Sequence, residues 1–308
     1  MLFRSVYAFV PHGGANPQYV RDQIAASIKK GIAPPPRAVD AVIAIENVRE
    51  YSNVMVIWEA LTQYKGQFAV PDQLDAVWTS DNYHDLHTEA LETPDVGAVD
   101  RAIFRALKND GSYIVIDHAA AKGAGFKQAE TLHRAEADAV RAEVIAAGFV
   151  LDGESKALAN AKDDHLKSAV DPIMHDKTDQ FAFRFKKPAN APSTDKRPPA
   201  SWMDNYYKNT YVYDMGAVAE RRHYYYPNGT YQEFGNTGTR LQEGWFFWDA
   251  DGHNCQLHQY PIPQRSLVVC HSFIARQLDV VGQQDNGYDP PRGLHPTKIM
   301  PGYHALPH

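Results

Sequence analysis

The sequence changes character at a proline-rich stretch that begins at residue 188. Before it, short apolar runs rich in β-branched residues alternate with segments of helical period, the pattern of a sheet covered by helices. After about residue 200 the chain is rich in aromatic residues, Gly, Pro and Asn, with almost no helical period. The polar stretch between has the composition of a linker. We therefore expect a Rossmann-like α/β domain over residues 1–188, a linker over 189–200 and a small all-β antiparallel domain over 201–308.

Composition narrows the classes of partner. The chain has 308 residues, of which 44% are hydrophobic, enough for real cores. A formal charge of -6 and a pI near 6.1 argue against nucleic acid or an anionic membrane as the main partner. No long apolar run occurs, and the first residues lack the features of a signal peptide. We expect a soluble protein that binds a small-molecule substrate.

Six apolar runs in the first part predict β-strands. Their continuous apolar character favours a parallel sheet that is buried on both faces. The expected strands span residues 6–10, 54–58, 75–79, 113–117, 150–157 and 181–185.

Two helices are expected between these strands. Apolar residues from Val99 to Leu107 recur at helical spacing, and Asn109-Asp110-Gly111 is expected to stop that helix. A second helix is predicted over residues 128–147, with Gly148 as the C′ residue that follows its end.

Polar, titratable side chains directly follow two of the expected strands. Residues 79–87 follow the third strand, and Asp117-His118 ends the fourth. In open α/β sheets, ligands bind outside the carboxyl ends of the strands. We therefore expect His84 and His118 to face a shared hollow at one rim of the sheet.

The order of several short motifs resembles a known family. The motifs are Leu74-Asp75-x-Val77-Trp78-Thr79-Ser80-x-Asn82-Tyr83-His84-Asp85-Leu86-His87, Ala106-Leu107-Lys108-x-x-Gly111, Val115-Ile116-Asp117-His118, Leu132-His133-Arg134, Ala147-Gly148-Phe149 and Lys177-Thr178-Asp179-Gln180-Phe181. Over roughly residues 50–188, this succession resembles the predicted class I S-adenosylmethionine-dependent methyltransferases of bacteria. The resemblance implies a seven-stranded sheet ending in an antiparallel strand, with S-adenosylmethionine over the first strands and the acceptor near the fourth and fifth.

The sequence departs from this family at its beginning. Members of the family begin with a strand and a glycine-rich turn that holds the cofactor, whereas this chain starts at the strand that follows, residues 6–10. Residues 1–5 also match what an in-frame sequencing-adapter tail would encode, so we expect an N-terminally truncated fragment from environmental DNA. An incomplete sheet would expose edges and favour a homo-oligomer. Gly13 and Gly14 offer a substitute glycine turn, although a tight turn without a ligand explains them more simply.

These patterns and the resemblance define a candidate site. The catalytic candidates are His84, Asp85, His118, His133 and Arg134, and the cofactor-binding candidates are Gly13, Gly14, Thr79, Asn82 and Asp117. His84 suits a general base that Asp85 orients. Capping of the next element also explains Asn82 and Asp85, and a histidine inside a helix, as expected for His133, is more often packed or solvated.

Further polar residues lie close to the last strand. Asp164, His165, His175, Lys177 and Asp179 suit either a lid over the pocket or a charged surface loop. The spacing predicts no metal site, because no motif such as His-Glu-x-x-His occurs; convergence of the histidines with Asp85 or Asp117 on zinc or iron remains an alternative. We expect a methyltransferase if catalysis is retained, and otherwise a non-catalytic ligand-binding protein or a metal-assisted hydrolase.

The second part predicts hairpins. Asn228-Gly229 lies between Tyr-rich runs, and Trp245-Phe246-Phe247-Trp248 precedes another turn signal. A hairpin that places Cys255 opposite Cys270 would suit a disulfide and a periplasmic or secreted protein, the alternative being two free thiols in the cytoplasm. This part loosely resembles small secreted β-modules, and its aromatic residues suit either a binding platform or a core. The tail after Gly282 is expected to be irregular.

Overall fold

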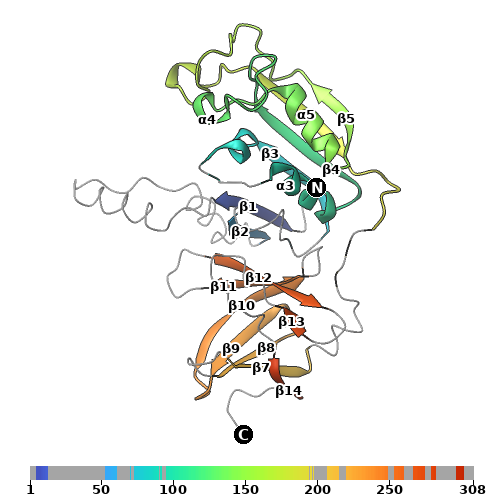
Figure 1. Cartoon of the computed structure of the whole chain (residues 1–308), viewed down its shortest axis with the longest axis vertical. Helices are drawn as coiled ribbons and strands as arrows, with labels where there is room; N and C mark the ends of the chain where they lie inside the picture. The colour runs from blue at the N-terminus through green and yellow to red at the C-terminus, as the bar shows by residue number, and fades with distance from the viewer. Residues whose placement is uncertain are drawn as a thin grey trace, which may run out of the picture.

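In the residues that it describes, the computed structural model contains three β-sheets (Figure 1). It describes residues 5–12, 53–60, 70, 73–89, 91, 95–193, 195, 197, 207–214, 220–248, 253–259, 266–274, 279–281 and 296–301. Two sheets belong to the α/β part, and the third is antiparallel and follows it in the chain. The predicted fold class, an incomplete α/β sheet followed by an antiparallel β domain, is confirmed.

The first sheet is a parallel pair. It consists of β1 (Val6–His12) and β2 (Val54–Ala60), with Val6 opposite Val54. Figure 1 shows this pair between the other two sheets. Both strands were predicted from their apolar runs.

The second sheet has the strand order β3-β4-β6-β5. The strands are β3 (Leu74–Ser80), β4 (Leu107–His118), β6 (Gln180–Lys186) and β5 (Val150–Ser155). β3 and β4 are parallel, whereas β6 is antiparallel to both β4 and β5. The last strand is therefore antiparallel, as the resemblance implies. Within the described residues, β1–β2 and β3–β4–β6–β5 are separate sheets and not one seven-stranded sheet.

The core of the α/β part lies between this sheet and two helices. They are α3 (Val96–Ala106), which is capped by the Asp95 carboxylate, and α5 (Ala137–Ala146). The main buried cluster contains Tyr83, Val96, Val99, Ile103, Leu107, Tyr113, Val115, Ala119, Ala135, Val140, Val144, Phe149, Phe181, Phe183 and Phe185. Phe9 of β1 packs against the same cluster, so the parallel pair also contributes to this core.

The helix predicted over residues 128–147 is wrong as a single element. The structure has a short α4 (Ala129–Leu132) and then α5, because His133 adopts a left-handed conformation with φ 53°. Ala135 then forms a β-bridge with Ala119, beyond the end of β4. This pairing draws the backbone out of the helix. Gly148, at φ 109°, follows α5 as the predicted C′ glycine.

The predicted stop signal at residues 109–111 is also misplaced. α3 ends at Ala106 and β4 begins at the next residue, so Asn109-Asp110-Gly111 lies inside the strand. The register between β3 and β4 shifts there, and Asp110 has φ 63°. Turn-type residues in this chain thus form an irregularity in the strand, and the helix ends before them.

The third sheet has eight antiparallel strands and is curled (Figure 1). Its strands are β7 (Asn209–Asp214), β8 (Glu220–Tyr225), β9 (Thr230–Gly235), β10 (Arg240–Trp248), β11 (His253–Gln259), β12 (Ser266–Ile274), β13 (Asp279–Val281) and β14 (Pro296–Pro301). The hairpin at Asn228-Gly229 is confirmed, with Gly229 at φ 83°. The irregular tail is wrong in part, because β14 pairs with β7.

The two cysteines lie opposite each other in the β11–β12 pair. This register, with Cys255 facing Cys270, is the predicted one. Cys255 is buried and disulfide-bonded. In the described part of the chain, no helix has the length and apolar character needed to cross a bilayer.

The α/β part and the third sheet share a small apolar cluster. Phe247 and Cys255 of the third sheet are grouped with Val70 and Ala106 of the α/β part. Arg197 also donates a hydrogen bond of 2.9 Å from Nε to the carbonyl oxygen of Trp248. The predicted linker therefore carries a contact to the third sheet.

Candidate active site

The chain turns sharply after β3 and forms a short 3-10 helix. Asp81, at φ 57°, makes the turn, and its backbone N–H donates to the Ile116 carbonyl oxygen of β4 at 3.0 Å. The helix η2 (His84–His87) follows at once. His84 and Asp85 are therefore held close to the end of β4, where Asp117 and His118 lie.

Asp117 and His84 form a buried pair. The Asp117 side chain is fully buried, and its Oδ1 lies 2.9 Å from His84 Nδ1. Its Oδ2 accepts the backbone N–H of His84 at 2.6 Å, and Oδ1 accepts the backbone N–H of His118 at 2.7 Å. The carboxylate favours a donating Nδ1–H, which directs the other ring nitrogen, Nε2, toward Asp85 Oδ1 at 3.2 Å.

The pKa values of His84 and His118 are shifted in opposite directions. Burial opposes a charge on His84, but hydrogen bonds to Asp117 and Asp85 raise its pKa to about 9. Burial is the largest effect on His118 and lowers its pKa, against the carboxylates of Asp81 and Asp117. A charged and a neutral imidazole side by side are the arrangement expected of an acid and a base.

His118 lies beside His84, as the sequence predicted. Their ring centroids are 6.2 Å apart. His118 Nδ1 is 2.9 Å from the Thr178 hydroxyl, while Nε2 lies 3.7 Å from Asp81 Oδ1. The connection before β6 therefore touches this site through Thr178.

His133 completes the group, although it does not lie inside a helix. Its ring meets the His84 ring edge-on with centroids 5.4 Å apart. Its Nδ1 is 3.9 Å from Asp85 Oδ1, and about a third of its side chain is exposed. The left-handed backbone at the end of α4 is what places this ring beside η2.

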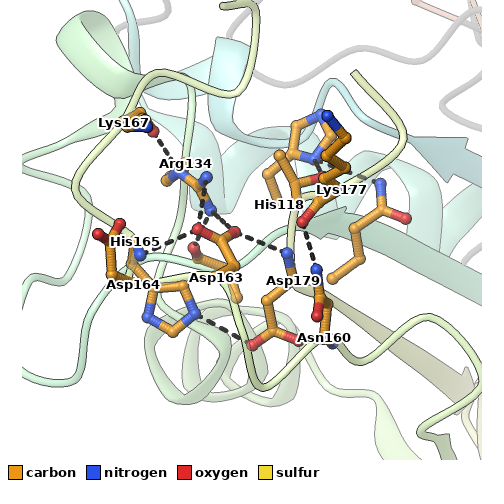
Figure 2. A network of polar contacts seen from close by, with 12 residues as sticks. His118, Arg134, Asn160, Asp163, Asp164, His165, Lys167, Lys177 and Asp179 are labelled. Atoms are coloured by element: carbon orange, nitrogen blue, oxygen red, sulfur yellow. Dashed lines mark hydrogen bonds and ion pairs between the residues drawn. The ribbon is translucent and has the colours of Figure 1, made fainter. Parts of the chain in front are cut away.

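Unlike the side chain of His133, the residue before it, that of Arg134 lies in a separate buried network. Its side chain is fully buried and pairs with Asp163 at 2.8 Å, and its other donors bind the carbonyl oxygens of Ala119 and Lys167 (Figure 2). All of these partners are protein groups. Arg134 therefore holds the β5–β6 connection in place, and its charge contributes, after burial, to the lowered pKa of His118; a catalytic role for it stays a prediction.

The predicted lid residues are partly fixed by the same network. Asp163 accepts the backbone N–H groups of His165 and Asp179, and His165 Nε2 is 3.1 Å from Asp179 Oδ2 (Figure 2). Against the effect of burial, these backbone bonds and Arg134 lower the pKa of Asp163. His175, by contrast, is 81% exposed. The connection is thus held at Asp163, His165 and Asp179 and is exposed at His175, which lies between them.

A second buried polar group lies behind η2, and sequence reasoning missed it. The Tyr83 hydroxyl is 2.8 Å from both Asp100 Oδ2 and Glu143 Oε2. His87 Nε2 is 2.9 Å from the same Glu143 oxygen. Burial, as the largest effect, raises the pKa of Asp100 to about 7. A carboxylate on the apolar face of α3, between Val99 and Ile103, was the available signal.

The cofactor-binding residues are only partly described. Gly13 and Gly14 lie outside the described residues. The hydroxyl of Thr79 bonds the side chain of Asn82, and both oxygens of Asp117 are used within the site. Their roles toward a cofactor stay predictions.

Two groups within the described residues have the composition of metal ligands. One is His84, Asp85 and His133, and the other is Asp81, Asp117 and His118. In each, the candidate ligand atoms lie within 4.8 Å of one another. The three histidines therefore converge, but they divide between two groups.

Comparison with known proteins gives only a distant likeness. No family model and no curated protein matches the chain. Among solved structures, it is similar to the (4+2)-cyclase SpnF, with a TM-score of 0.36 and 16% identity over 61% of this chain and 78% of SpnF. For an S-adenosylmethionine-dependent methyltransferase from Mesorhizobium loti, the TM-score is 0.35 and the identity 11%, over 60% of this chain and 93% of that one. For the N-methyltransferase NodS from Bradyrhizobium japonicum, the TM-score is 0.33 and the identity 14%, over 60% of this chain and 87% of NodS. Similarity at this level carries no inference about activity.

Proposed function

We propose that this chain is an S-adenosylmethionine-dependent methyltransferase that acts on a small-molecule acceptor. The observation that carries the proposal is the pairing of His84 and His118, with ring centroids 6.2 Å apart, around the buried carboxylate of Asp117. His84 follows the carboxyl end of β3, and Asp117 and His118 form the carboxyl end of the parallel strand β4, where ligands bind in sheets of this kind. The choice of S-adenosylmethionine as the methyl donor rests on the motif resemblance described above.

The reaction needs alignment and the removal of one proton. The acceptor oxygen or nitrogen attacks the sulfonium methyl carbon, the carbon–sulfur bond breaks with its electron pair going to sulfur, and the acceptor proton passes to a base. His118 suits the base in the tautomer whose Nδ1–H donates to Thr178 and whose Nε2 carries the lone pair, which requires the Gln180 amide, 3.3 Å from Nδ1, to turn away. The Asp117 carboxylate holds His84 in place through hydrogen bonds to its backbone N–H and to its ring nitrogen Nδ1. Alignment of this kind supplies much of the rate enhancement.

Calorimetric titration of the full chain tests donor binding first. We expect S-adenosylmethionine and S-adenosylhomocysteine to bind and to raise the melting temperature. A methyl-labelled donor and a panel of phenols, amines and carboxylic acids then identify the acceptor. If neither S-adenosylmethionine nor S-adenosylhomocysteine gives a heat of binding at millimolar concentration and the melting temperature does not change, the proposal is contradicted.

A pair of histidine variants tests the site. We expect His118→Asn to lower kcat by about 100-fold or more, the usual contribution of a general base, with little change in donor affinity. The matched control is His175→Asn, which replaces a histidine that is exposed and belongs to the same connection as Thr178. Equal loss in both variants, or none in His118→Asn, would contradict the assignment of the base.

Two other functions predict different results from the same experiments. A ligand-binding protein without chemistry would bind a small molecule but transfer no methyl group. A metal-assisted hydrolase would not bind the methyl donor, and a chelator would abolish its activity. The two ligand-like groups of the site make this second function the more specific alternative.

A further inference from the structure

We propose that His84, Asp85 and His133 bind one divalent transition-metal ion of the zinc class. The site goes beyond the proposed function, because metal binding requires neither a methyl donor nor an acceptor. Two imidazole nitrogens and one carboxylate oxygen form a common ligand set for such ions. The sequence spacing did not predict it, because the ligands come from η2 and from the end of α4.

The distances between the ligand atoms suit a single small ion. Asp85 Oδ1 lies 3.2 Å from His84 Nε2 and 3.9 Å from His133 Nδ1. In a tetrahedral zinc site, ligand atoms lie about 3.4 Å apart, since the metal–ligand bonds are about 2.0–2.1 Å long. Ligand formation therefore requires His133 to move by on the order of 1 Å, and its partly exposed ring has room to do so.

His84 Nε2 and Asp85 Oδ1 face each other at 3.2 Å, and two such acceptor atoms need a proton or a metal ion between them. In the neutral form of His84, Asp117 favours the tautomer with a proton on Nδ1, which leaves a lone pair on Nε2. That lone pair points at the carboxylate of Asp85. A metal ion between them replaces this contact with two bonds.

Asp117 is placed as an outer partner of the metal ligand. Metal-bound histidines commonly donate their other ring N–H to a carboxylate, which fixes the ring and strengthens the ligand. The Asp117 carboxylate is fully buried and accepts the backbone N–H groups of His84 and His118, so it cannot easily swing away. The same bonds occupy both of its oxygens, which argues against Asp81, Asp117 and His118 as the metal site.

The site has an open side. The side chains of Asp85 and His133 are 40% and 34% exposed, whereas His84 is 4% exposed. Three protein ligands with an accessible fourth position are typical of zinc sites that bind water or substrate, and four protein ligands are typical of structural sites.

Titration of the chelator-treated, tag-free full chain with Zn²⁺ or Co²⁺, without any methyl donor, tests the site. We expect binding of about one equivalent and a visible Co²⁺ spectrum typical of four-coordinate nitrogen and oxygen ligands. We expect His133→Asn and Asp85→Asn each to weaken binding at least tenfold, and Asp117→Asn to weaken it about 10- to 100-fold. His175→Asn is the control and keeps the wild-type affinity.

The outcomes separate this proposal from the function above. Absence of stoichiometric binding to the wild-type chain overturns it and means that a proton fills the place between His84 and Asp85. Binding that survives both His133→Asn and Asp85→Asn also overturns it. Because these two residues are partly exposed, their variants are expected to fold, and far-ultraviolet circular dichroism checks this. Failure of methyl transfer alone leaves the metal result intact.

Discussion

Among the described residues, the α/β part and the eight-stranded sheet both bury large aromatic side chains, but the α/β part also fully buries charged ones. In the α/β part the largest fully buried side chain is Arg134, which pairs with Asp163, and Asp100 and Asp117 are buried nearby. In the eight-stranded sheet the corresponding side chains are Tyr211, Tyr225 and Tyr231. Burial of an aromatic ring is favourable, whereas burial of a charge is costly unless it is paired.

We interpret this difference as one of role. In the α/β part the buried charges position functional side chains, whereas in the third sheet the buried aromatic residues stabilise the fold. The buried charges of the α/β part surround η2 and the β5–β6 connection, the two segments that carry or touch His84 and His118. Replacement of buried ion pairs by apolar residues is often stabilising, so their presence is better explained by the placement of functional groups. The aromatic interior of the third sheet needs no such explanation.

The largest expected effect comes from breaking the buried ion pair. Arg134→Met leaves Asp163 buried without its cation and should reduce the free energy of unfolding by about 3–5 kcal/mol. Urea denaturation measures this. The double variant Arg134→Met with Asp163→Asn should recover part of the loss, because no charge is left unpaired and the amide oxygen still accepts a backbone N–H.

The matched control for that variant is Arg240→Met. Arg240 pairs with Glu243 on the surface at 2.8 Å, with both side chains about half exposed. Its replacement should cost about 0–1 kcal/mol. Similar losses in Arg134→Met and Arg240→Met would show that the buried network contributes nothing special, and the contrast between the two regions would fail.

Reduction of the Cys255 disulfide should have the next largest effect. Cys270 is the only other cysteine of the chain and lies opposite Cys255. Closing a loop of about 15 residues stabilises a fold by about 3 kcal/mol in the chain-entropy account. Dithiothreitol should lower the stability of the wild type by about this amount. The double variant Cys255→Ala with Cys270→Ala should show no response to reductant.

This disulfide also bears on where the protein is found. We expect peptide mass spectrometry without reduction to recover the Cys255–Cys270 linked fragment, which would favour an oxidising compartment. Two alkylatable thiols in the native chain would contradict both the linkage and the expected loss of stability.

The Asp100 group gives a pH-dependent prediction. The single hydroxyl proton of Tyr83 faces two carboxyl groups, so one of them must carry a proton for both hydrogen bonds to form. A raised folded-state pKa stabilises the fold most below the unfolded value of 3.8, and this stabilisation is lost as the pH rises to about 7. Asp100→Asn removes this dependence.

The measurement is a difference between two proteins. From pH 4 to 7, the stability of Asp100→Asn relative to wild type should rise by up to about 1.4 kcal/mol per pH unit. Asp138→Asn is the control, because Asp138 is a 66% exposed aspartate that pairs with Arg141. A constant difference between Asp100→Asn and wild type across this range would contradict a proton shared behind η2.

The sequence predicted the histidines at the strand ends but not the buried polar group of Tyr83, Asp100 and Glu143 behind η2. The apolar runs predicted β3 and β4, and the rule that ligands bind at carboxyl strand ends brought His84 and His118 together. Those inferences use only local pattern and topology. The bonds from Tyr83 to Asp100 and Glu143 join residues up to 60 positions apart and depend on how α3 and α5 pack.

The broken helix at His133 has the same cause. The residues from 128 to 147 have an acceptable helical period, and nothing local requires a break. The bridge between Ala135 and Ala119, with hydrogen bonds from Ala135 to His118 and from Ala120 to Ala135, outweighs this local preference. A long-range pairing thus places His133 beside His84.

The smallest expected effect tests the aromatic side of the comparison. Phe246 is buried and meets the Tyr225 ring with centroids 4.9 Å apart. Phe246→Leu keeps an apolar side chain of similar size and should cost less than about 1.5 kcal/mol, without altering metal or donor binding. Urea denaturation and the titrations described above measure both. A loss as large as that of Arg134→Met would mean that ring geometry, and not only apolar burial, specifies the third sheet.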